Sequence, residues 1–442
     1  MHRLIWVGLL SAAVCQAQNP SLDAGGQQDS LWLSWRGPLQ SGFAPDAEPP
    51  LQWSDTNHVQ WKFAVPGRGH STPIVLADRV IVTAAVPVGE GFEPRFSGRP
   101  GAHDNLPVTH RQQFVAFALG RDTGRLLWRR MLYETEPHEG AHYTASLASH
   151  SPVSDGQRIV VSFGSHGLFC LDLNGKVLWQ KQLGEMHTKH GHGEGASPVL
   201  AERYVVVNWD HEGQSFLVAF DKFSGEQIWK RARREVTSWA TPIVIEQQGK
   251  QQLVVSGTQR VRGYDLQTGE TIWECGGMSA NIVASPVSRN GIVFAGSSYE
   301  KRALLAIDIQ GARGDLTATK NVLWDRFRGT PYVPSPLLYE DALYFLTHYQ
   351  GILTRVDANT GRDAPGAFRL GGLGNIYASP VGAAGRVYVT DLRGDTLVIS
   401  HDANPRVLAR NRLGEPVSAS AALAGTQLFL RGDKHLFCLQ NP

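Results

Sequence analysis

The chain has 442 residues, with 42 Lys and Arg against 40 Asp and Glu, so its formal net charge is +2. A charge this close to zero provides no general electrostatic attraction to nucleic acid or to anionic membranes. Hydrophobic residues make up 42%, charged residues 19%, and there are 47 Gly and 24 Pro, a composition that excludes disordered and collagen-like classes. We expect a packed, turn-rich monomer with no nucleic-acid partner.

The N-terminus has the features of a cleaved export signal over residues 1–17. A basic start precedes an apolar run over residues 4–14, and small residues end at Ala17. The run is too short to span a bilayer, and no later stretch approaches the roughly 20 apolar residues of a transmembrane helix. We therefore expect a periplasmic or secreted protein. Lipid anchoring at Cys15 is an alternative, although Val14 is bulkier than the residue that normally precedes a lipidated cysteine.

Three cysteines follow the signal, Cys170, Cys275 and Cys438, and each lies in or beside an apolar strand pattern. An odd number in an oxidising compartment cannot pair completely within one chain. We expect three buried free thiols.

A strand start recurs along the chain as a Ser/Thr-Pro pair followed by apolar residues. The copies stand at Thr72-Pro73, Ser151-Pro152, Ser197-Pro198, Thr241-Pro242, Ser285-Pro286, Ser335-Pro336 and Ser379-Pro380, with a weaker one at Ser420-Ala421. The period is about 45 residues, broken by one early insertion, which is typical of four-stranded propeller blades. Each start is followed by β-rich runs separated by turn residues.

A second signature joins the third and fourth strands in several of the repeats. It is clearest from Ala219 to Trp229 and from Gly263 to Trp273, where Asp, Ser/Thr and Gly precede the Trp by fixed spacings. Asp and Ser/Thr can hydrogen-bond the turn backbone, Gly can adopt positive φ, and Trp can cover a neighbouring blade. These tryptophans are expected to pack rather than to catalyse.

The Ala-x-Asp-x-x-Ser/Thr-Gly-x-x-x-Trp pattern resembles the tryptophan-docking motif of the PQQ-like β-propeller superfamily. That superfamily includes quinoprotein alcohol dehydrogenases and the propeller lipoprotein of the outer-membrane barrel-assembly machinery. The opening Trp32-x-x-Trp35-Arg36-Gly37-Pro38 is similar to secreted bacterial members of mostly unassigned function. The resemblance covers roughly residues 32–440 and implies the fold more strongly than any activity.

Eight strand starts predict an all-β, single eight-bladed propeller of four-stranded antiparallel blades over residues 52–442. An N-terminal extension over residues 18–51 is expected to pack on it. The last start leaves room for only three strands, so the missing fourth is expected from Val59–Val65 near the N-terminus. Such closure removes an exposed sheet edge.

Polar residues gather in the segments that lead into each blade and in the loops between second and third strands, which share one face. Long loops on a rigid scaffold commonly carry binding or chemistry. The candidate ligand-binding residues on this face are His70, His142, Tyr143, Trp239, Arg328, Tyr332, Tyr377 and Arg393. Arg side chains there can hold a carboxylate or sulfate on a sugar, or they are ordinary solvated loop charges.

The densest titratable segment runs from Met186 to Gly195. His190 and His192 in this segment, with His211 completing the set, are candidate ligands for a divalent transition metal. Candidate catalytic residues are His150, His211, His348, Tyr349 and Arg302, because His and Tyr can exchange protons and Arg can neutralise a carboxylate. The competing interpretation is that these histidines are surface groups or loop-tying donors.

Two functions remain open, and the first is a binding scaffold for a protein or glycan partner. The second is a metal-assisted or His/Tyr-based carbohydrate-active enzyme, a lyase or hydrolase. A PQQ-dependent dehydrogenase is a minor alternative, because the resemblance implies adjacent cysteines, calcium ligands and a catalytic Asp in such enzymes. The sequence has no adjacent Cys pair. PQQ is therefore not expected, and the cofactor is unknown.

Overall fold

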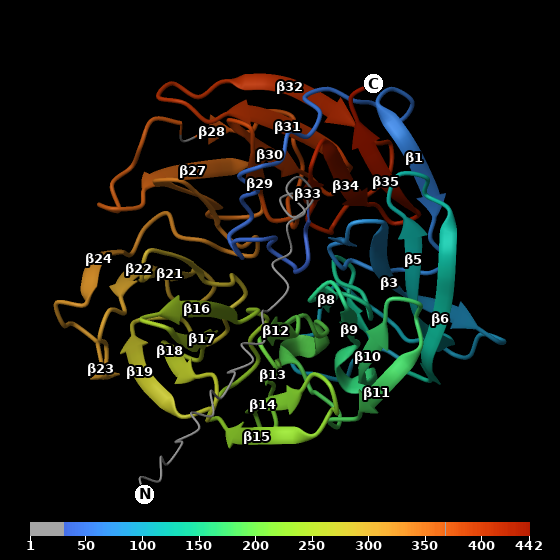
Figure 1. Cartoon of the computed structure of the whole chain (residues 1–442), viewed down its shortest axis with the longest axis horizontal. Helices are drawn as coiled ribbons and strands as arrows, with labels where there is room; N and C mark the ends of the chain where they lie inside the picture. The colour runs from blue at the N-terminus through green and yellow to red at the C-terminus, as the bar shows by residue number, and fades with distance from the viewer. Residues whose placement is uncertain (1–30, 367) are drawn as a thin grey trace, which may run out of the picture.

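A ring of eight blades surrounds a central axis in the computed structural model, which describes residues 31–366 and 368–442 (Figure 1). Each blade is a four-stranded antiparallel sheet, and the first strands of neighbouring blades contact one another around the axis. The architecture is thus the predicted all-β, eight-bladed propeller.

The strands of the first four blades follow one another along the chain. Blade 1 contains β2 (Ile74–Val75), β3 (Arg79–Val88), β5 (Arg111–Gly120) and β6 (Leu126–Thr135); blade 2 contains β8 (Val153–Ser154), β9 (Arg158–Ser162), β10 (Leu168–Asp172) and β11 (Val177–Lys181); blade 3 contains β12 (Val199–Ala201), β13 (Tyr204–Trp209), β14 (Phe216–Asp221) and β15 (Gln227–Ala232); blade 4 contains β16 (Ile243–Gln247), β17 (Lys250–Gly257), β18 (Arg260–Asp265) and β19 (Thr271–Gly276).

The second half of the ring repeats this plan. Blade 5 contains β20 (Val287–Arg289), β21 (Ile292–Ser297), β22 (Ala303–Asp308) and β24 (Val322–Arg326); blade 6 contains β25 (Leu337–Tyr339), β26 (Ala342–Leu346), β27 (Ile352–Asp357) and β28 (Phe368–Arg369); blade 7 contains β29 (Val381–Ala383), β30 (Arg386–Thr390), β31 (Asp395–Ser400) and β32 (Val407–Arg412); blade 8 contains β33 (Ala422–Ala424), β34 (Gln427–Arg431), β35 (His435–Gln440) and β1 (Val59–Ala64).

Several short elements are added to the four-stranded blades. They are β23 (Gly314–Asp315), which extends blade 4 beside β19, the pair β4 (Asn105–Leu106) and β7 (Ala141–His142), and the 3-10 turns Gly164–His166 and Lys189–Gly191. In the part of the chain that the structure describes, no helical segment has the length and apolarity needed to cross a membrane.

The ring closes through β1, which pairs antiparallel with β35 and places Lys62 opposite Phe437. The predicted closure by an N-terminal strand is confirmed. Because β1 and β35 come from opposite ends of the propeller sequence, their pairing joins the first and last parts of the ring and covers the edge that β35 would otherwise expose.

The recurring Ser/Thr before proline forms a ladder around the axis. Each hydroxyl oxygen accepts a hydrogen bond of 2.8–2.9 Å from the corresponding backbone N–H of the preceding blade. Seven such links run from Thr72 to Ser420, and within the described residues Thr72 Oγ1 has no partner to complete an eighth. The repeated Ser/Thr therefore satisfies buried backbone groups where the blades converge.

The tryptophan signature also acts between blades. Trp128, Trp179, Trp229 and Trp324 each lie over the turn glycine of the next blade and donate from Nε1 to a carbonyl there. Trp273 is an exception to the predicted docking, because its Nε1 donates to Gln252 Oε1 within its own blade, 2.9 Å away. The β23 strand lies beside it instead.

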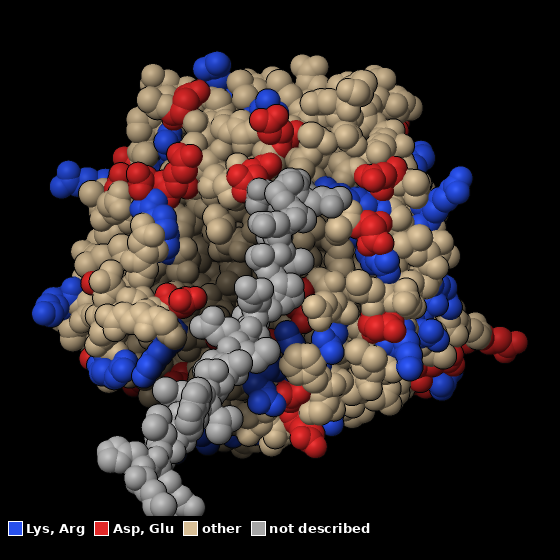
Figure 2. Space-filling model, in the orientation of Figure 1, with Lys and Arg blue, Asp and Glu red and all other residues tan. Residues whose placement is uncertain are grey.

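The main hydrophobic clusters lie between neighbouring blades. Val160 of blade 2 and Val207 of blade 3, for example, belong to one cluster of buried side chains. Cys170, Cys275 and Cys438 are buried and free, as expected from the sequence. On the face seen in Figure 2, Lys and Arg side chains are interspersed with Asp and Glu, in line with the near-zero net charge.

Residues 31–51 cross the ring beside the turns that join the first and second strands of the blades. Trp32 forms a β-bridge with Val75 of blade 1, and Phe43 forms another with Gly382 of blade 7. Between them, the buried Arg36 guanidinium donates to the carbonyls of Pro336 and Pro380 at 2.9 and 3.0 Å. Burial lowers the pKa of Arg36 to about 9. The predicted signal at residues 1–17 lies outside the described residues.

Candidate functional site

The two ends of the ring differ in character. We call the end that carries the segments between blades and the loops between second and third strands the loop face, and the opposite end the turn face. On the loop face, a cavity of about 420 Å³ lies where these loops converge. We call it the loop-face cavity.

Aromatic rings dominate the wall of the loop-face cavity. They belong to Trp35, Tyr143, Trp239, Tyr299, Tyr332, Tyr349 and Tyr377. The amides of Asn281 and Asn375 and the side chain of Lys189 supply polar groups among these rings. A concave site of this size, with aromatic walls and a few polar groups, has the usual properties of a small-ligand site.

One wall is a stack of rings from blades 6 and 7. Tyr349 lies 4.0 Å from His348 and 5.6 Å from Tyr377, measured between ring centroids, and the Tyr349–Tyr377 pair is stacked. Tyr332 is parallel to His348 at 5.6 Å. Burial, followed by the hydrogen bond with Tyr143, raises the pKa of Tyr377. Tyr143 comes from the segment between blades 1 and 2, so this contact bridges distant parts of the ring.

Histidines form another part of the wall, and the Tyr143 ring lies 4.7 Å from that of His142. His103, His142, His190 and His192 line the loop-face cavity, and His192 lies 5.0 Å from both His103 and His142 between centroids. Burial and then the neighbouring imidazoles lower the pKa of His192 to about 4. Burial also lowers the pKa of His142.

The long insertion of blade 1 brings these histidines together. Its short strand β4 pairs with β7, which places Asn105 opposite His142. The Asn105 amide donates to the carbonyls of His190 and Gly191 and accepts from Nδ1 of His192 at 3.0 Å. Asn105 thus joins three chain segments that are remote in sequence, through its side chain and through the β4–β7 pairing.

His70 reaches the cavity from the segment before blade 1. Its Nδ1 lies 3.0 Å from the carbonyl oxygen of Thr144, and its Nε2 lies 3.4 Å from Asp433 Oδ1. Burial lowers the pKa of His70, and the contact with Asp433 opposes that shift. The ring therefore ties the segment after β7 to blade 8.

Nine of the residues singled out from the sequence line this one cavity. They are His70, His142, Tyr143, His190, His192, Trp239, Tyr332, Tyr349 and Tyr377. Their convergence follows from blade topology, since the segments entering all eight blades end near the axis.

Six other candidates do not line the loop-face cavity. Arg302, Arg328, Arg393 and His348 are exposed, and His348 stacks on the lining residue Tyr332. His211 is buried, with Nδ1 accepting from the His187 N–H at 3.1 Å and Nε2 lying 3.3 Å from the Gln214 carbonyl oxygen. Both ring nitrogens of His211 are therefore engaged away from His190 and His192.

His150 lies beneath the cavity wall. It is 3% exposed and borders a small void of about 20 Å³ together with His138, His166 and Glu194. Burial lowers the pKa of His150 to about 4 and that of His166 to about 3, and it raises the pKa of Glu194. Side chains alternate along the extended segment, so Ser149 faces the loop-face cavity while His150 faces the void.

Several lining residues were not singled out as site candidates from the sequence. His103 and Asp104 stand in the insertion, Lys189 stands beside His190, and Asn281 and Asn375 are isolated in their loops. Lys189 Nζ contacts Asn281 Oδ1 at 2.6 Å and Glu300 Oε1 at 2.8 Å. The signal for His103 and Asp104 was their place among the polar residues of a long insertion that the sequence assigns to the loop face.

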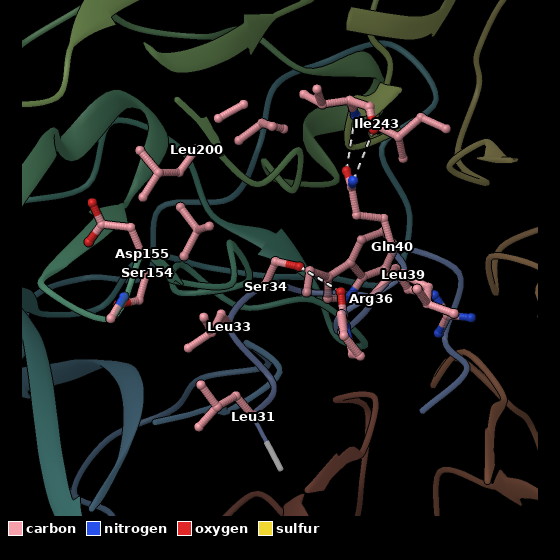
Figure 3. A pocket seen from close by; sticks show the side chains of 18 of the residues that line it. Leu31, Leu33, Ser34, Arg36, Leu39, Gln40, Ser154, Asp155, Leu200 and Ile243 are labelled. Atoms are coloured by element: carbon pink, nitrogen blue, oxygen red, sulfur yellow. Dashed lines mark hydrogen bonds between the residues drawn. The ribbon is translucent and has the colours of Figure 1, made fainter. Parts of the chain in front are cut away.

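The turn face carries a larger cavity of about 1050 Å³ (Figure 3). Leu31, Leu33 and Leu39 line it, and Gln40 holds the backbone of Val244 through hydrogen bonds of 3.0 Å to both its N–H and its carbonyl. Trp35 lines both cavities and so lies between them. The titratable groups singled out from the sequence are therefore on the loop-face side of this residue.

The profile of the family described as outer membrane protein assembly factor BamB matches residues 112–366, more than half of the chain. The chain belongs to this family. No curated protein sequence matches it. Family membership agrees with the resemblance that the docking signature indicated.

Solved structures share the fold at low sequence identity. BamB from Moraxella catarrhalis is 16% identical with a TM-score of 0.55, covering 81% of this chain and all of its own. A europium-containing methanol dehydrogenase is 10% identical with a TM-score of 0.61, covering 94% and 99% respectively. Quinohemoprotein alcohol dehydrogenase from Comamonas testosteroni is 10% identical with a TM-score of 0.57, covering 93% and 80%. At these identities the likeness concerns the fold alone.

The loop-face cavity does not fit a quinone site built on a calcium-type ion. Hard cations of that type take oxygen ligands, whereas this wall is rich in imidazole nitrogen. Its carboxylates are Asp104 and Glu194, and Glu194 already accepts from the Ser165 N–H and hydroxyl at 2.8 and 2.6 Å. The cysteines Cys170, Cys275 and Cys438 lie in β10, β19 and β35 and do not line it.

Proposed function

We propose that the chain is an exported propeller that binds an oligosaccharide in the loop-face cavity, without quinone-dependent redox catalysis. The observation that carries this is the cavity itself, about 420 Å³ with seven Trp and Tyr rings in its lining. Aromatic faces can cover the apolar faces of sugar rings, while Asn, His and Tyr exchange hydrogen bonds with their hydroxyls. The export signal that the sequence predicts at residues 1–17 supports a role outside the cytoplasm.

A protein partner fits this geometry less well. Stable protein interfaces bury about 800 Å² on each side and centre on apolar and aromatic anchors. The aromatic rings here line a concavity of small-ligand size and alternate with titratable groups. The geometry therefore favours a small, ring-containing polar ligand over a flat protein surface.

Isothermal titration calorimetry against neutral and uronate-containing oligosaccharides tests the proposal. We expect one panel member to bind, and Tyr349→Ala and Tyr377→Ala to weaken it at least about fivefold through loss of ring contacts. Leu39→Ala, on the turn face, is the control and should bind as wild type does. Absence of binding across the panel, or equal weakening by Leu39→Ala, would overturn the proposal.

A second candidate is a carbohydrate-active enzyme with lyase or hydrolase chemistry. It is favoured by the histidines and tyrosines that line one cavity, because proton transfer to and from a sugar needs such groups within reach. Incubating the bound oligosaccharide with the protein and following shorter products by mass spectrometry separates the two functions. Intact sugar after prolonged incubation supports binding alone.

A further inference from the structure

We propose that the imidazoles of His103, His142 and His192 bind one divalent transition-metal ion of the zinc class, with a further position open toward the loop-face cavity. This inference rests on the proposed function, because the ion would lie in the wall of the same cavity. Three protein ligands and one open position are the arrangement of zinc sites that contact substrates.

The ring separations suit a shared ion. The centroid distances are 5.0 Å for His103–His192, 5.0 Å for His142–His192 and 6.0 Å for His103–His142. Imidazoles sharing a tetrahedral zinc at the usual Zn–N distance have centroids roughly 5 Å apart. Ligand atoms of His103, Asp104 and His142 lie within 4.8 Å of one another, and His192 is outside that group. His192 would therefore join His103 and His142 at one ion only after its side chain rotates.

Polar contacts at Nδ1 hold the three imidazoles, so that Nε2 of each ring is left for the ion. Nδ1 of His192 donates to Asn105 Oδ1 at 3.0 Å, and Nδ1 of His103 lies 3.3 Å from Asp104 Oδ2. His142 directs Nδ1 to Thr144 Oγ1 at 2.7 Å. Among the described residues, the Nε2 atoms of these three rings have no hydrogen-bond partner. Metal-binding histidines commonly use one nitrogen for such an outer contact and present the other to the metal.

The surrounding backbone is held in an uncommon conformation. Asp104 and His190 have φ values of 54° and 57°, in the left-handed region that few residues other than glycine adopt. His190 is fixed there by a 2.7 Å hydrogen bond from Nδ1 to the Pro100 carbonyl, and its ring lies 5.3 Å from that of His192. Nine other described residues besides glycine share this conformation, so it fixes the backbone at Asp104 and His190 without by itself marking a site.

A second group, His138, Glu139 and His187, also brings ligand atoms within 4.8 Å. Two of its members have other partners: Nε2 of His138 donates to the Met186 carbonyl at 2.8 Å, and Glu139 accepts from Arg99 Nε at 3.1 Å, whereas the buried Nδ1 of His187 has no partner among the described residues. Glu139 also accepts from the Thr188 N–H. This group therefore provides the comparison for the test.

The test uses full-length mature protein without a histidine tag, treated with chelator and titrated with Zn²⁺. We expect one equivalent to bind in wild type, and His103→Ala to weaken binding at least tenfold. His103 is exposed, so this variant should fold, which circular dichroism verifies. Two control variants, His348→Ala and His187→Ala, should retain wild-type affinity.

A Co²⁺ titration provides a second readout. A visible absorption band should report nitrogen coordination in wild type and diminish in His103→Ala and His192→Ala. No specific Zn²⁺ or Co²⁺ binding, or loss caused by His187→Ala and not by His103→Ala, would overturn the inference.

Oligosaccharide titration with and without chelator separates this inference from the proposed function. Sugar binding by a protein that takes up no metal would overturn the metal site and leave the proposed function standing. Metal uptake at the three histidines without binding of any panel sugar would support the metal site and overturn the proposed function.

Discussion

Histidines on the loop face differ chiefly in their access to water. His142 and His192 are half-buried in the wall of the loop-face cavity, whereas His150 and His166 are enclosed beneath it. An imidazole without water or a carboxylate partner resists protonation, which explains the lowered pKa values of His150 and His166. Enclosed imidazoles of this kind make the free energy of unfolding depend on pH. They do not contact a ligand in the cavity.

His150 should make the fold sensitive to acid. Its pKa is about 4 in the folded state and about 6.5 when unfolded, so the unfolded chain binds the proton first as pH falls. Its contribution to stability is complete above pH 6.5 and declines by about 3 kcal/mol on reaching pH 4. We expect His150→Gln to remove this part of the acid sensitivity, measured by urea unfolding between pH 7 and pH 4. Parallel pH profiles for wild type and variant would contradict this account.

The face of the ring on which a residue lies was easier to infer from the sequence than the direction in which its side chain points. The sequence placed His150 on the correct face, but it could not show that Ser149 faces the cavity while His150 faces the void. Likewise, His211 belongs to a loop-face segment, yet its contacts with His187 and Gln214 turn it away from the cavity. These directions depend on tertiary contacts that no local pattern records.

Contacts between blades were more predictable where one recurring motif supplies both of the residues that meet. The turn glycine and the docking tryptophan recur with fixed spacing, and Trp229 does cover Gly269 of the next blade. The insertion of blade 1 was not predictable in the same way, because the β4–β7 pairing involves only two residues on each strand. That pairing nevertheless brings His103 to His142.

Substitution at Gly269 tests the docking contact. A Cβ there would lie 2.6 Å from the Trp229 ring at a φ of 70°, whereas a Cβ at Gly249, where φ is 71°, would have no neighbouring atom within 4 Å. Gly249→Ala should therefore lose only about 1 kcal/mol for the left-handed backbone. Gly269→Ala should lose about 1–3 kcal/mol more because the indole must move. Equal free energies of unfolding for the two variants would exclude a role for docking.

The whole molecule explains why a site can form at the axis. The Ser/Thr ladder and the β1–β35 pairing hold eight blades in one ring, so their loops converge on a shared space. Counting repeats was sufficient to predict the ring and its closure. The volume of the loop-face cavity and the position of Trp35 between the two faces depend on packing and could not be predicted from the repeats.

The central claim is that ligand binding occurs in the loop-face cavity. Hydrogen-exchange mass spectrometry, with and without a saturating concentration of the tightest-binding oligosaccharide of the panel, tests it most directly. We predict slower exchange in residues 136–149, 182–198 and 370–380, each of which contains residues that line that cavity, and unchanged exchange in residues 38–46 on the turn face. Protection confined to residues 38–46, or none at saturation, would contradict the claim.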